Sequence, residues 1–265
     1  MDYDRIVTHT DFDGLISALL LQDAFGVQKV YFVEPWEIQE GRFTAQQGDI
    51  VCDLPYAKGC SLWFDHHAST AGDADKGVHR LTPSCARLIF EELLPTHPTL
   101  EKRRAIVDAT DKIDTASFTK ADLEHPGVYG KLSMAIRSDD KRKDDEFRRF
   151  LLNMLAFQSP EQVIEQPIIK KRVEEKLAQH ERWRREIPRY VTLRGCVIFV
   201  NRLDAPEDLP HGQVFWLYLR YPGHAVHVTV DRMQFEPDKV KVSVGENIFE
   251  QRNRVNLGAL MQRYG

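Results

Sequence analysis

Residues 3–21 have the sequence YDRIVTHTDFDGLISALLL, and this stretch decides the fold class. Residues 3–8 form a short β-rich run that ends in polar residues, as at the end of a strand. Residues 15–21 are apolar nearly all round, which is typical of a helix that is buried on most sides. A strand that leads directly into a buried helix is typical of an α/β protein, so we expect an α/β sheet.

Three further short β-rich runs follow, and they lack a regular alternation of apolar and polar residues. That pattern indicates strands covered on both faces by helices, as in a parallel sheet. The strand candidates are residues 29–33, 49–52 and 61–64, and the helix candidates that follow them are residues 83–94 and 100–107. The sequence therefore predicts an N-terminal domain of the parallel α/β class.

The middle of the chain predicts a helical connector. Residues 137–150 are dense in mixed charges, which favours a solvated loop or helix face. Ser159-Pro160-Glu161 is a typical helix start and Pro188 a typical stop, so one long helix is predicted over residues 159–187. We interpret this helix as the link between two domains.

The last part of the chain predicts a smaller α+β domain. Its strand candidates are residues 196–200, 214–219, 225–230 and 240–244, and its closing helix is residues 255–264. Tyr221-Pro222-Gly223 would make a hairpin turn between the middle two strands. The predicted division is residues 1–157, 158–188 and 189–265.

Composition excludes several classes of protein. The 265 residues carry a net charge of −4, which argues against coating long nucleic acid by phosphate neutralisation alone, but not against a short anionic ligand. No apolar run approaches the roughly 20 residues of a membrane helix, and the N-terminus lacks the pattern of a secretory signal. The four cysteines form no C-x-x-C pair and are expected to be buried in a reducing cytosol. We therefore expect a cytoplasmic protein with neither a membrane nor long duplex nucleic acid as partner.

The residues between the first strand and the first helix have the chemistry of a metal site. His9, Asp11 and Asp13 alternate along a tight turn, and Gly14 permits the close entry into the helix. Imidazole nitrogen together with carboxylate oxygen suits Mn²⁺ or Mg²⁺. A calcium loop of the EF-hand type is one alternative, but its closing acidic position would fall on Leu20, which cannot bind a cation.

Two later strand candidates also end in residues that can bind metals. Asp53 directly follows the third strand candidate, and Asp65-His66-His67 directly follows the fourth. A single acid after a strand is usually a turn or cap residue, so each cluster alone is weak evidence. In an open parallel sheet, however, ligands bind outside the carboxyl ends of the strands, so the three clusters should converge.

A fourth group of acids lies on a predicted helix. Asp108, Asp111 and Asp114 have the i, i+3 spacing that puts them along one helical face. The spacing does not decide which of them would point at a metal. Taken alone, the group is explained equally well as an acidic helix end.

Taken in order, these motifs resemble the DHH phosphoesterase superfamily. The resemblance rests on His9-x-Asp11-x-Asp13-Gly14, Asp53, Asp65-His66-His67 and an Asp within residues 108–114. The superfamily includes a single-strand-specific exonuclease, oligoribonuclease-like enzymes, cyclic-dinucleotide phosphodiesterases, manganese pyrophosphatases and exopolyphosphatases. The two-domain layout extends the likeness across the chain.

The resemblance implies a centre of two divalent cations, with Mn²⁺ expected and Mg²⁺ as the alternative. Asp53 would bridge both cations, and for the ligand from the fourth group the resemblance favours Asp111 while Asp108 and Asp114 stay open. One cation would be held by His9, Asp11 and Asp53, and the other by Asp13, Asp53, His66 and the acid of the fourth group. Two such cations lower the pKa of a shared water and neutralise charge on the attacking and leaving oxygens of a phosphate.

The resemblance also implies which further residues act in catalysis. Beside the bridging Asp53, Asp65 would orient the histidines, and His67 would contact the scissile phosphate. In the second domain, Ser243 and Arg254 are weaker candidates for substrate binding, because a strand end and a helix start explain them equally well.

The second domain departs from the family pattern, which usually has a glycine-rich stretch with a substrate-contacting histidine. Residues 256–260 resemble the approach to that stretch, and Tyr264-Gly265 resembles its first step. The sequence leaves open whether the motif follows Gly265.

We therefore expect a metal-dependent phosphohydrolase with its active site between the two domains. The expected reaction is hydrolysis of a short oligonucleotide or dinucleotide through a hydroxide that bridges the two cations. An exopolyphosphatase or pyrophosphatase on the same centre is the alternative, and a base-stacking aromatic such as Trp216, Tyr218 or Phe249 would separate the two. A non-catalytic sensor of a phosphate ligand is the alternative from another class. The expected partner is a small phosphorylated substrate, and a homo-oligomer is left open.

Overall fold

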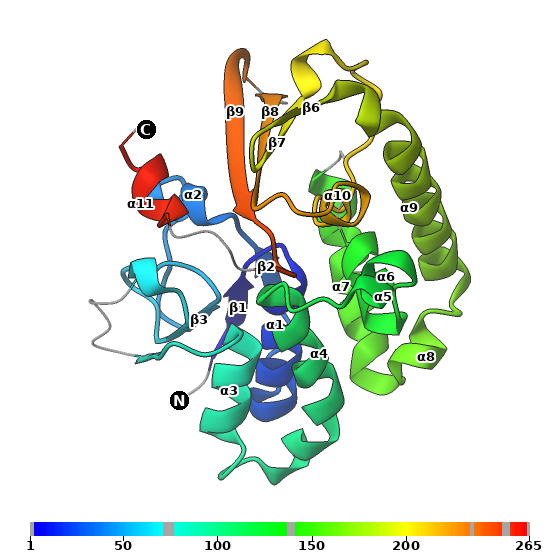
Figure 1. The fold of residues 1–265 in the computed structure, drawn as a ribbon. Coiled ribbons are helices and arrows are strands. Elements are labelled where there is room, and N and C mark those ends of the chain that lie inside the picture. The colour runs from blue at the N-terminus through cyan, green and yellow to red at the C-terminus, as the bar shows by residue number, and fades with distance from the viewer. Residues whose placement is uncertain (1–2, 71–76, 137–140, 234–235, 251–254, 264–265) are drawn as a thin grey trace. The chain divides into compact units, whose positions relative to one another are not determined.

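The chain folds into two compact units. The computed structural model describes residues 3–70, 77–136, 141–233, 236–250 and 255–263 (Figure 1). Unit 1 consists of Met1–Ser117 and Gly127–Val173, and unit 2 consists of Phe118–Pro126 and Glu174–Gly265. Residues 118–126, which lie within the predicted first domain, thus group with the second unit.

Unit 1 is built on a five-stranded parallel sheet with the strand order β2-β1-β3-β4-β5. Its strands are β1 (Arg5–Thr8), β2 (Val30–Phe32), β3 (Asp49–Cys52), β4 (Leu62–Asp65) and β5 (Gly77–His79). The register aligns Thr8 of β1 with Cys52 of β3, and Cys52 with Phe64 of β4. Three neighbouring strands therefore end at the same level, and the predicted parallel α/β class is confirmed.

Helix α1 is buried along most of its length. The helices of unit 1 are α1 (Phe12–Phe25), α2 (Pro35–Gln39), α3 (Cys85–Leu93), α4 (Arg104–Asp114), α6 (Val128–Ala135), α7 (Lys141–Phe157) and α8 (Pro160–Val163), with 3-10 turns at Ala68–Thr70 and Pro98–Arg103. Every residue from Phe12 to Gln22 is buried, because α1 contacts β1, α3, α4 and α7. Its start requires Gly14, since a Cβ atom there would lie 2.3 Å from the carbonyl oxygen of His9.

The predicted helix over residues 159–187 is interrupted. Helix α8 ends at Val163, and the next helix, α9, spans Pro167–Glu186. Pro167 explains the break, because its ring lacks an N–H and clashes with the carbonyl group four residues earlier, that of Val163. Helix α9 begins in unit 1 and ends in unit 2.

The charged stretch over residues 137–150 is helical where it is described, and not all of its charges are solvated. Helix α7 begins at Lys141, and residues 137–140 lie outside the described residues. Asp144 and Arg148 are buried, so the predicted solvated face is wrong for these two. Asp144 accepts a hydrogen bond from Arg172 of α9, and a paired cation is what makes a buried carboxylate tolerable.

Unit 2 contains a four-stranded mixed sheet with the order β6-β7-β8-β9. Its strands are β6 (Val191–Arg194), β7 (Val197–Asn201), β8 (Val226–Met233) and β9 (Glu236–Glu246). The pair β7–β8 is parallel, and the outer two pairs are antiparallel. The unpredicted strand β6 turns into β7 through Gly195, whose φ of 56° favours glycine. The remaining helices are α5 (Lys120–Glu124), α10 (Trp216–Arg220) and α11 (Leu257–Met261), with 3-10 turns at Ile187–Tyr190 and Arg202–Asp204.

The predicted strand over residues 214–219 is wrong, because residues 216–219 lie in helix α10. The parallel strands β7 and β8 need a crossover between them, and a hairpin cannot supply one. A short apolar run fits a buried strand or a buried helix turn equally well, so periodicity alone could not decide. The predicted hairpin at residues 221–223 is therefore also wrong, since this turn joins a helix to a strand.

Aromatic side chains form much of the core of unit 2. Trp183 and Tyr218 are buried in it, and Trp216 and Phe249 pack against it partly buried. The aromatic residues considered for base stacking thus contribute to the packing of unit 2.

Three of the four cysteines are buried, as predicted. These are Cys52, Cys60 and Cys85, whereas Cys196 is exposed in the turn before β7. Within the described ranges, no helix combines the length and the apolar character that crossing a bilayer demands.

Candidate metal centre

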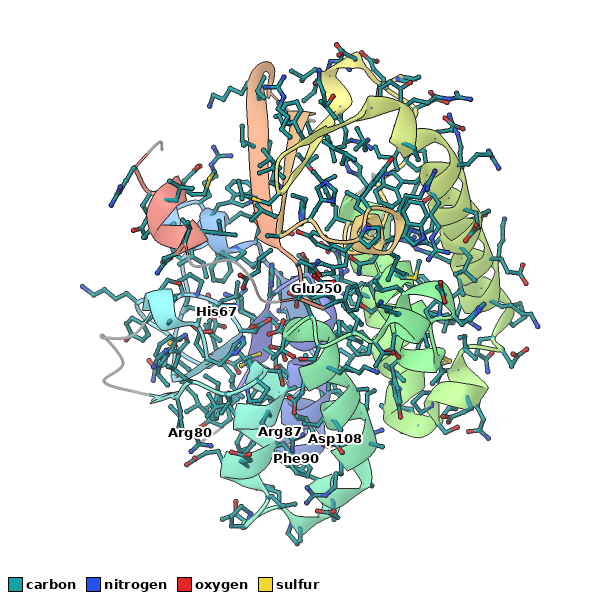
Figure 2. All side chains as sticks on the ribbon, viewed as in Figure 1. His67, Arg80, Arg87, Phe90, Asp108 and Glu250 are labelled. Atoms are coloured by element: carbon teal, nitrogen blue, oxygen red, sulfur yellow. The ribbon has the colours of Figure 1, made fainter. Side chains whose placement is uncertain are left out.

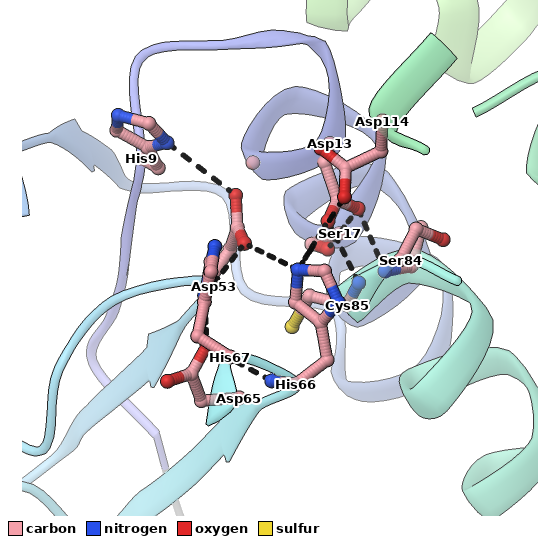
Figure 3. A network of polar contacts seen from close by, with 12 residues as sticks. His9, Asp13, Ser17, Asp53, Asp65, His66, His67, Ser84, Cys85 and Asp114 are labelled. Carbon is pink, nitrogen blue, oxygen red and sulfur yellow. Dashed lines mark hydrogen bonds and ion pairs between the residues drawn. The ribbon is translucent and has the colours of Figure 1, made fainter. Parts of the chain in front are cut away.

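The carboxyl ends of β1, β3 and β4 bring the predicted motifs together (Figure 3). His9 comes directly after β1, Asp53 directly after β3, and Asp65 is the last residue of β4. Asp53 is 1% exposed and has a φ of 55°, in the left-handed region that few residues other than glycine adopt. Aspartate tolerates this region better than most side chains, and the turn carries its carboxylate to the middle of the centre.

One side of the centre lies around His9. Its Nδ1 is 2.9 Å from Oδ2 of Asp11 and 3.6 Å from Oδ2 of Asp53. Its Nε2 is 3.4 Å from Oε2 of Glu34, which also accepts a hydrogen bond from Thr10 at 2.5 Å through Oε1. Glu34 was missed by the sequence analysis, although it directly follows the predicted strand over residues 29–33 and so has the same signal as Asp53.

The other side lies around His66. Its Nε2 is 3.5 Å from Oδ2 of Asp13, 3.6 Å from Oδ1 of Asp53 and 3.6 Å from Oδ2 of Asp114. Its Nδ1 lies 3.0 Å from the carbonyl oxygen of Thr82, which can only accept, so Nδ1 donates. In the neutral imidazole this bond keeps the proton on Nδ1, so that Nε2, which faces the carboxylates, is the nitrogen that can bind a cation.

Within the fourth group, Asp114 and not Asp111 lies beside the other candidate ligands. The two oxygens of Asp111 accept hydrogen bonds from Ser84 Oγ at 2.6 Å and from Arg87 Nε at 2.8 Å. Asp108 is paired with the same arginine at the surface. The geometry therefore favours Asp114 over the expected Asp111 as the ligand from this group. The partners that occupy Asp111 come from a distant segment, which the i, i+3 spacing could not reveal.

Asp65 contacts both histidines that follow it. Its Oδ1 accepts the backbone N–H of His66 at 2.9 Å and lies 2.8 Å from Nδ1 of His67, while Oδ2 accepts from Thr70. The hydrogen bond to Asp65 is the main reason why the pKa of His67 is raised. His67 keeps 46% of its side chain exposed, and its Nε2 is not the nitrogen that faces Asp65.

The carboxylates of the centre repel one another and attract positive charge. Burial and the charges of Asp53 and Asp114 raise the pKa of Asp13 well above its usual value, and burial with the charge of Asp53 raises that of Asp114 to about 6. Burial lowers the pKa of His9 and His66, but their carboxylate neighbours outweigh it and raise the two values to about 12 and about 9. Such a cluster is the electrostatic environment that a divalent cation requires.

The donor atoms fit divalent cations. Both carboxylate oxygens of Asp53 and Nε2 of His66 are buried without a hydrogen-bond partner among the described residues. Buried polar atoms normally have a partner, so these orphaned atoms indicate a missing ligand. Three sets of candidate ligand atoms lie within 4.8 Å of one another: His9, Asp11 and Asp53; Asp53, His66 and His67; and Asp13, His66 and Asp114. Oxygen and imidazole ligands without a thiolate suit Mn²⁺ or Mg²⁺.

The two weaker candidates for substrate binding come from the other unit. Ser243 lies on β9, opposite Thr229 of β8. Arg254 lies outside the described residues.

No family model and no curated protein matches the chain, but solved structures do. The pGpG-specific phosphodiesterase PggH from Vibrio cholerae has a TM-score of 0.82 and 25% sequence identity, over 99% of this chain and 89% of that one. An exopolyphosphatase-related protein from Bacteroides fragilis has a TM-score of 0.52 and 13% identity, over 92% of this chain and 79% of that one. The second likeness shows a shared fold alone, whereas the first is consistent with a phosphoesterase of the DHH superfamily.

Proposed function

We propose that this chain is a phosphodiesterase that uses two divalent cations, Mn²⁺ or Mg²⁺, to hydrolyse a linear dinucleotide such as pGpG. The observation that carries the proposal is three buried atoms without a hydrogen-bond partner, both carboxylate oxygens of Asp53 and Nε2 of His66, at the meeting point of the candidate ligand sets. The similarity to a pGpG-specific phosphodiesterase over 99% of the chain supports the choice of substrate.

The residues of unit 1 would divide between the two cations around Asp53. When bound, the cations would lower the pKa of an attacking water and offset negative charge on the phosphate oxygens. His9 and Asp11 would hold one cation together with Asp53, while Glu34 would orient the imidazole of His9. The second cation would be held by Asp13, Asp53, His66 and Asp114.

His67 is the side chain best suited to contact the scissile phosphate. Its Nδ1 faces Asp65 at 2.8 Å, and its side chain is half exposed. The adjacent carboxylate raises its pKa, which favours an imidazolium that donates to a phosphate oxygen through Nε2. The Asp65 side chain is fully buried, so water does not compete with His67 for its carboxylate, and the imidazole keeps this orientation.

The test is product release from a substrate panel, with and without Mn²⁺. The panel contains pGpG, a pyrimidine dinucleotide, pyrophosphate and polyphosphate. We expect Mn²⁺-dependent release of mononucleotide from pGpG, abolished by a chelator and by Asp53→Asn, and retained by Glu91→Gln, which alters an exposed ion pair on α3.

Other outcomes of the same panel would overturn the proposal. Release from polyphosphate or pyrophosphate without cleavage of dinucleotides would leave the centre a phosphohydrolase but refute the substrate. Two bound Mn²⁺ ions with no turnover of any substrate would indicate a sensor of a phosphate ligand.

A further inference from the structure

The segment from Thr82 to Arg87, which leads into α3, contacts two of the side chains assigned to the second cation. Its Thr82 carbonyl accepts the hydrogen bond from Nδ1 of His66 at 3.0 Å. The backbone N–H groups of Cys85 and Ala86 donate to Oδ2 and Oδ1 of Asp13, at 2.7 and 2.8 Å. The orientations of both the imidazole and the carboxylate therefore depend on where this segment lies.

Ser84 holds the segment in two directions at once. As the N-cap of α3, its Oγ accepts the backbone N–H of Arg87 at 2.9 Å. The same hydroxyl donates its hydrogen to Oδ1 of Asp111 at 2.6 Å. A hydroxyl has a single hydrogen, so the bond to Asp111 directs that hydrogen away and leaves a lone pair for the cap.

Arg87 joins the same carboxylate from the next turn of α3. Its Nε donates to Oδ2 of Asp111 at 2.8 Å, and its guanidinium also pairs with Asp108. Arg87 of α3 and Asp108 of α4 are labelled in Figure 2. The side chains of Arg87 and Asp111 are 14% and 18% exposed, whereas that of Asp108 is 57% exposed. The inner bond to Asp111 is therefore the better shielded from solvent of the two.

Helix α4 carries both Asp111 and the candidate ligand Asp114 on the same face, one turn apart. Fixing Asp111 to the start of α3 therefore also fixes the distance from Asp114 to His66 and Asp13. Side chains behind a metal site commonly control its affinity in this way.

We propose that Ser84, Arg87 and Asp111 form a positioning cluster for the second cation, which orients Asp13, His66 and Asp114 without touching the metal. The inference rests on the two-cation centre of the proposed function. The first site is positioned by a different segment, because His9 and Asp11 lie in the turn between β1 and α1. Asp11 is the N-cap of α1 there and accepts the backbone N–H of Gly14 at 2.9 Å.

The experiment compares Asp111→Asn with Asp108→Asn in the full chain. Both variants alter a carboxylate of α4 that pairs with Arg87, so they differ mainly in the bond to Ser84 and in burial. Binding of Mn²⁺ is followed by electron paramagnetic resonance and calorimetric titration, which give the affinity of each site. We expect Asp111→Asn to weaken one of the two sites by roughly 10- to 100-fold and the other by less than about twofold. Asp108→Asn should leave both sites within about twofold of wild type.

Three results separate the explanations. Unchanged metal binding by Asp111→Asn would overturn the positioning role. Equal weakening of both metal sites would overturn it too, since a bond that only stabilises the fold has no reason to affect one site more than the other. Wild-type protein that binds fewer than two Mn²⁺ ions would instead overturn the proposed function. If circular dichroism shows that Asp111→Asn does not fold, Ser84→Ala and Arg87→Lys test whether one metal site weakens more than the other while the carboxylate of Asp111 is retained.

Discussion

Replacement of Asp114 by asparagine should stabilise the metal-free protein and yet weaken its binding of the second cation. Burial and the negative charges of Asp53 and Asp11 raise the pKa of Asp114 from 3.8 to about 6. The folded state therefore disfavours the charged form, so above pH 6 Asp114 destabilises the native protein. Below pH 3.8 the carboxyl is neutral in both states and costs nothing, which means that the gain from the substitution should vanish there.

The size of the effect follows from the same values. The rise from 3.8 to about 6 corresponds to about 3 kcal/mol, at about 1.4 kcal/mol for each step of one in pKa. Solvent screening reduces this figure, because the Asp114 side chain is 27% exposed, so we expect on the order of 1–2 kcal/mol. For a domain of this size that is roughly 2–8 °C in Tm.

The assay is thermal unfolding of both proteins in EDTA and in Mn²⁺, at pH 7.5 and at pH 4. At pH 7.5 in EDTA the variant should melt higher. In Mn²⁺ at about 100 times the Kd, each occupied site adds about 2.7 kcal/mol to the wild type, so the order should reverse. A variant that melts below the wild type in EDTA at pH 7.5 would refute the assignment of Asp114 to a strained, like-charged centre.

Three further predictions concern the histidines. His67→Gln should lower kcat by about 10²- to 10³-fold while two Mn²⁺ ions still bind, because it removes a hydrogen-bond donor to the phosphate and not a metal ligand. Steady-state kinetics together with a metal titration checks this, and loss of a bound metal ion would contradict it. Binding of Mn²⁺ at pH 7.5 should release about two protons, since the pKa values of about 12 for His9 and 9 for His66 keep both imidazoles protonated until metal displaces the proton. Calorimetry in buffers of different ionisation enthalpy measures the number of protons released. Release of no protons would exclude both histidines as ligands. Burial lowers the pKa of His227 to about 4, so its contribution to stability is complete above pH 6.5 and is lost as the pH falls towards 4. Between pH 7.5 and 4.5, urea unfolding should show a loss of stability that is smaller in His227→Gln than in the wild type by about 2–3 kcal/mol, and equal losses would contradict this prediction.

Much of the candidate metal centre could be predicted from the sequence, because many of its side chains lie at the carboxyl ends of strands. His9, Asp53 and Asp65 occur at the ends of recognisable strands, and in a parallel sheet those ends meet. Glu34 carries the same signal at the end of β2 and could have been found by applying the rule to every strand. The motifs that carry the resemblance include no residue between Gly14 and Asp53, so the resemblance did not point to it.

The choice among the acids of α4 was beyond the sequence. Asp111 and Asp114 share a helical face, so spacing alone treats them alike. What separates them is the start of α3, where Ser84 and Arg87 occupy Asp111. These contacts join residues 27 and 24 positions apart and leave no periodic trace.

The prediction of secondary structure failed where the local sequence preference and the tertiary contacts favour different structures. The apolar run around Trp216 fits a strand as well as a helix, and only the crossover between β7 and β8 requires the helix. The buried Asp144 looks solvated in sequence, because its partner Arg172 lies on another helix.

The left-handed backbone at Asp53 has an evolutionary consequence. Holding a residue other than glycine there costs on the order of 1–3 kcal/mol, and the carboxylate faces other buried acids. A descendant in which glycine or asparagine replaced this aspartate would relieve strain or repulsion while losing the bridging group. In the metal-free protein either replacement would therefore raise the folding stability, so that binding of the cations and selection for turnover are what would keep the aspartate.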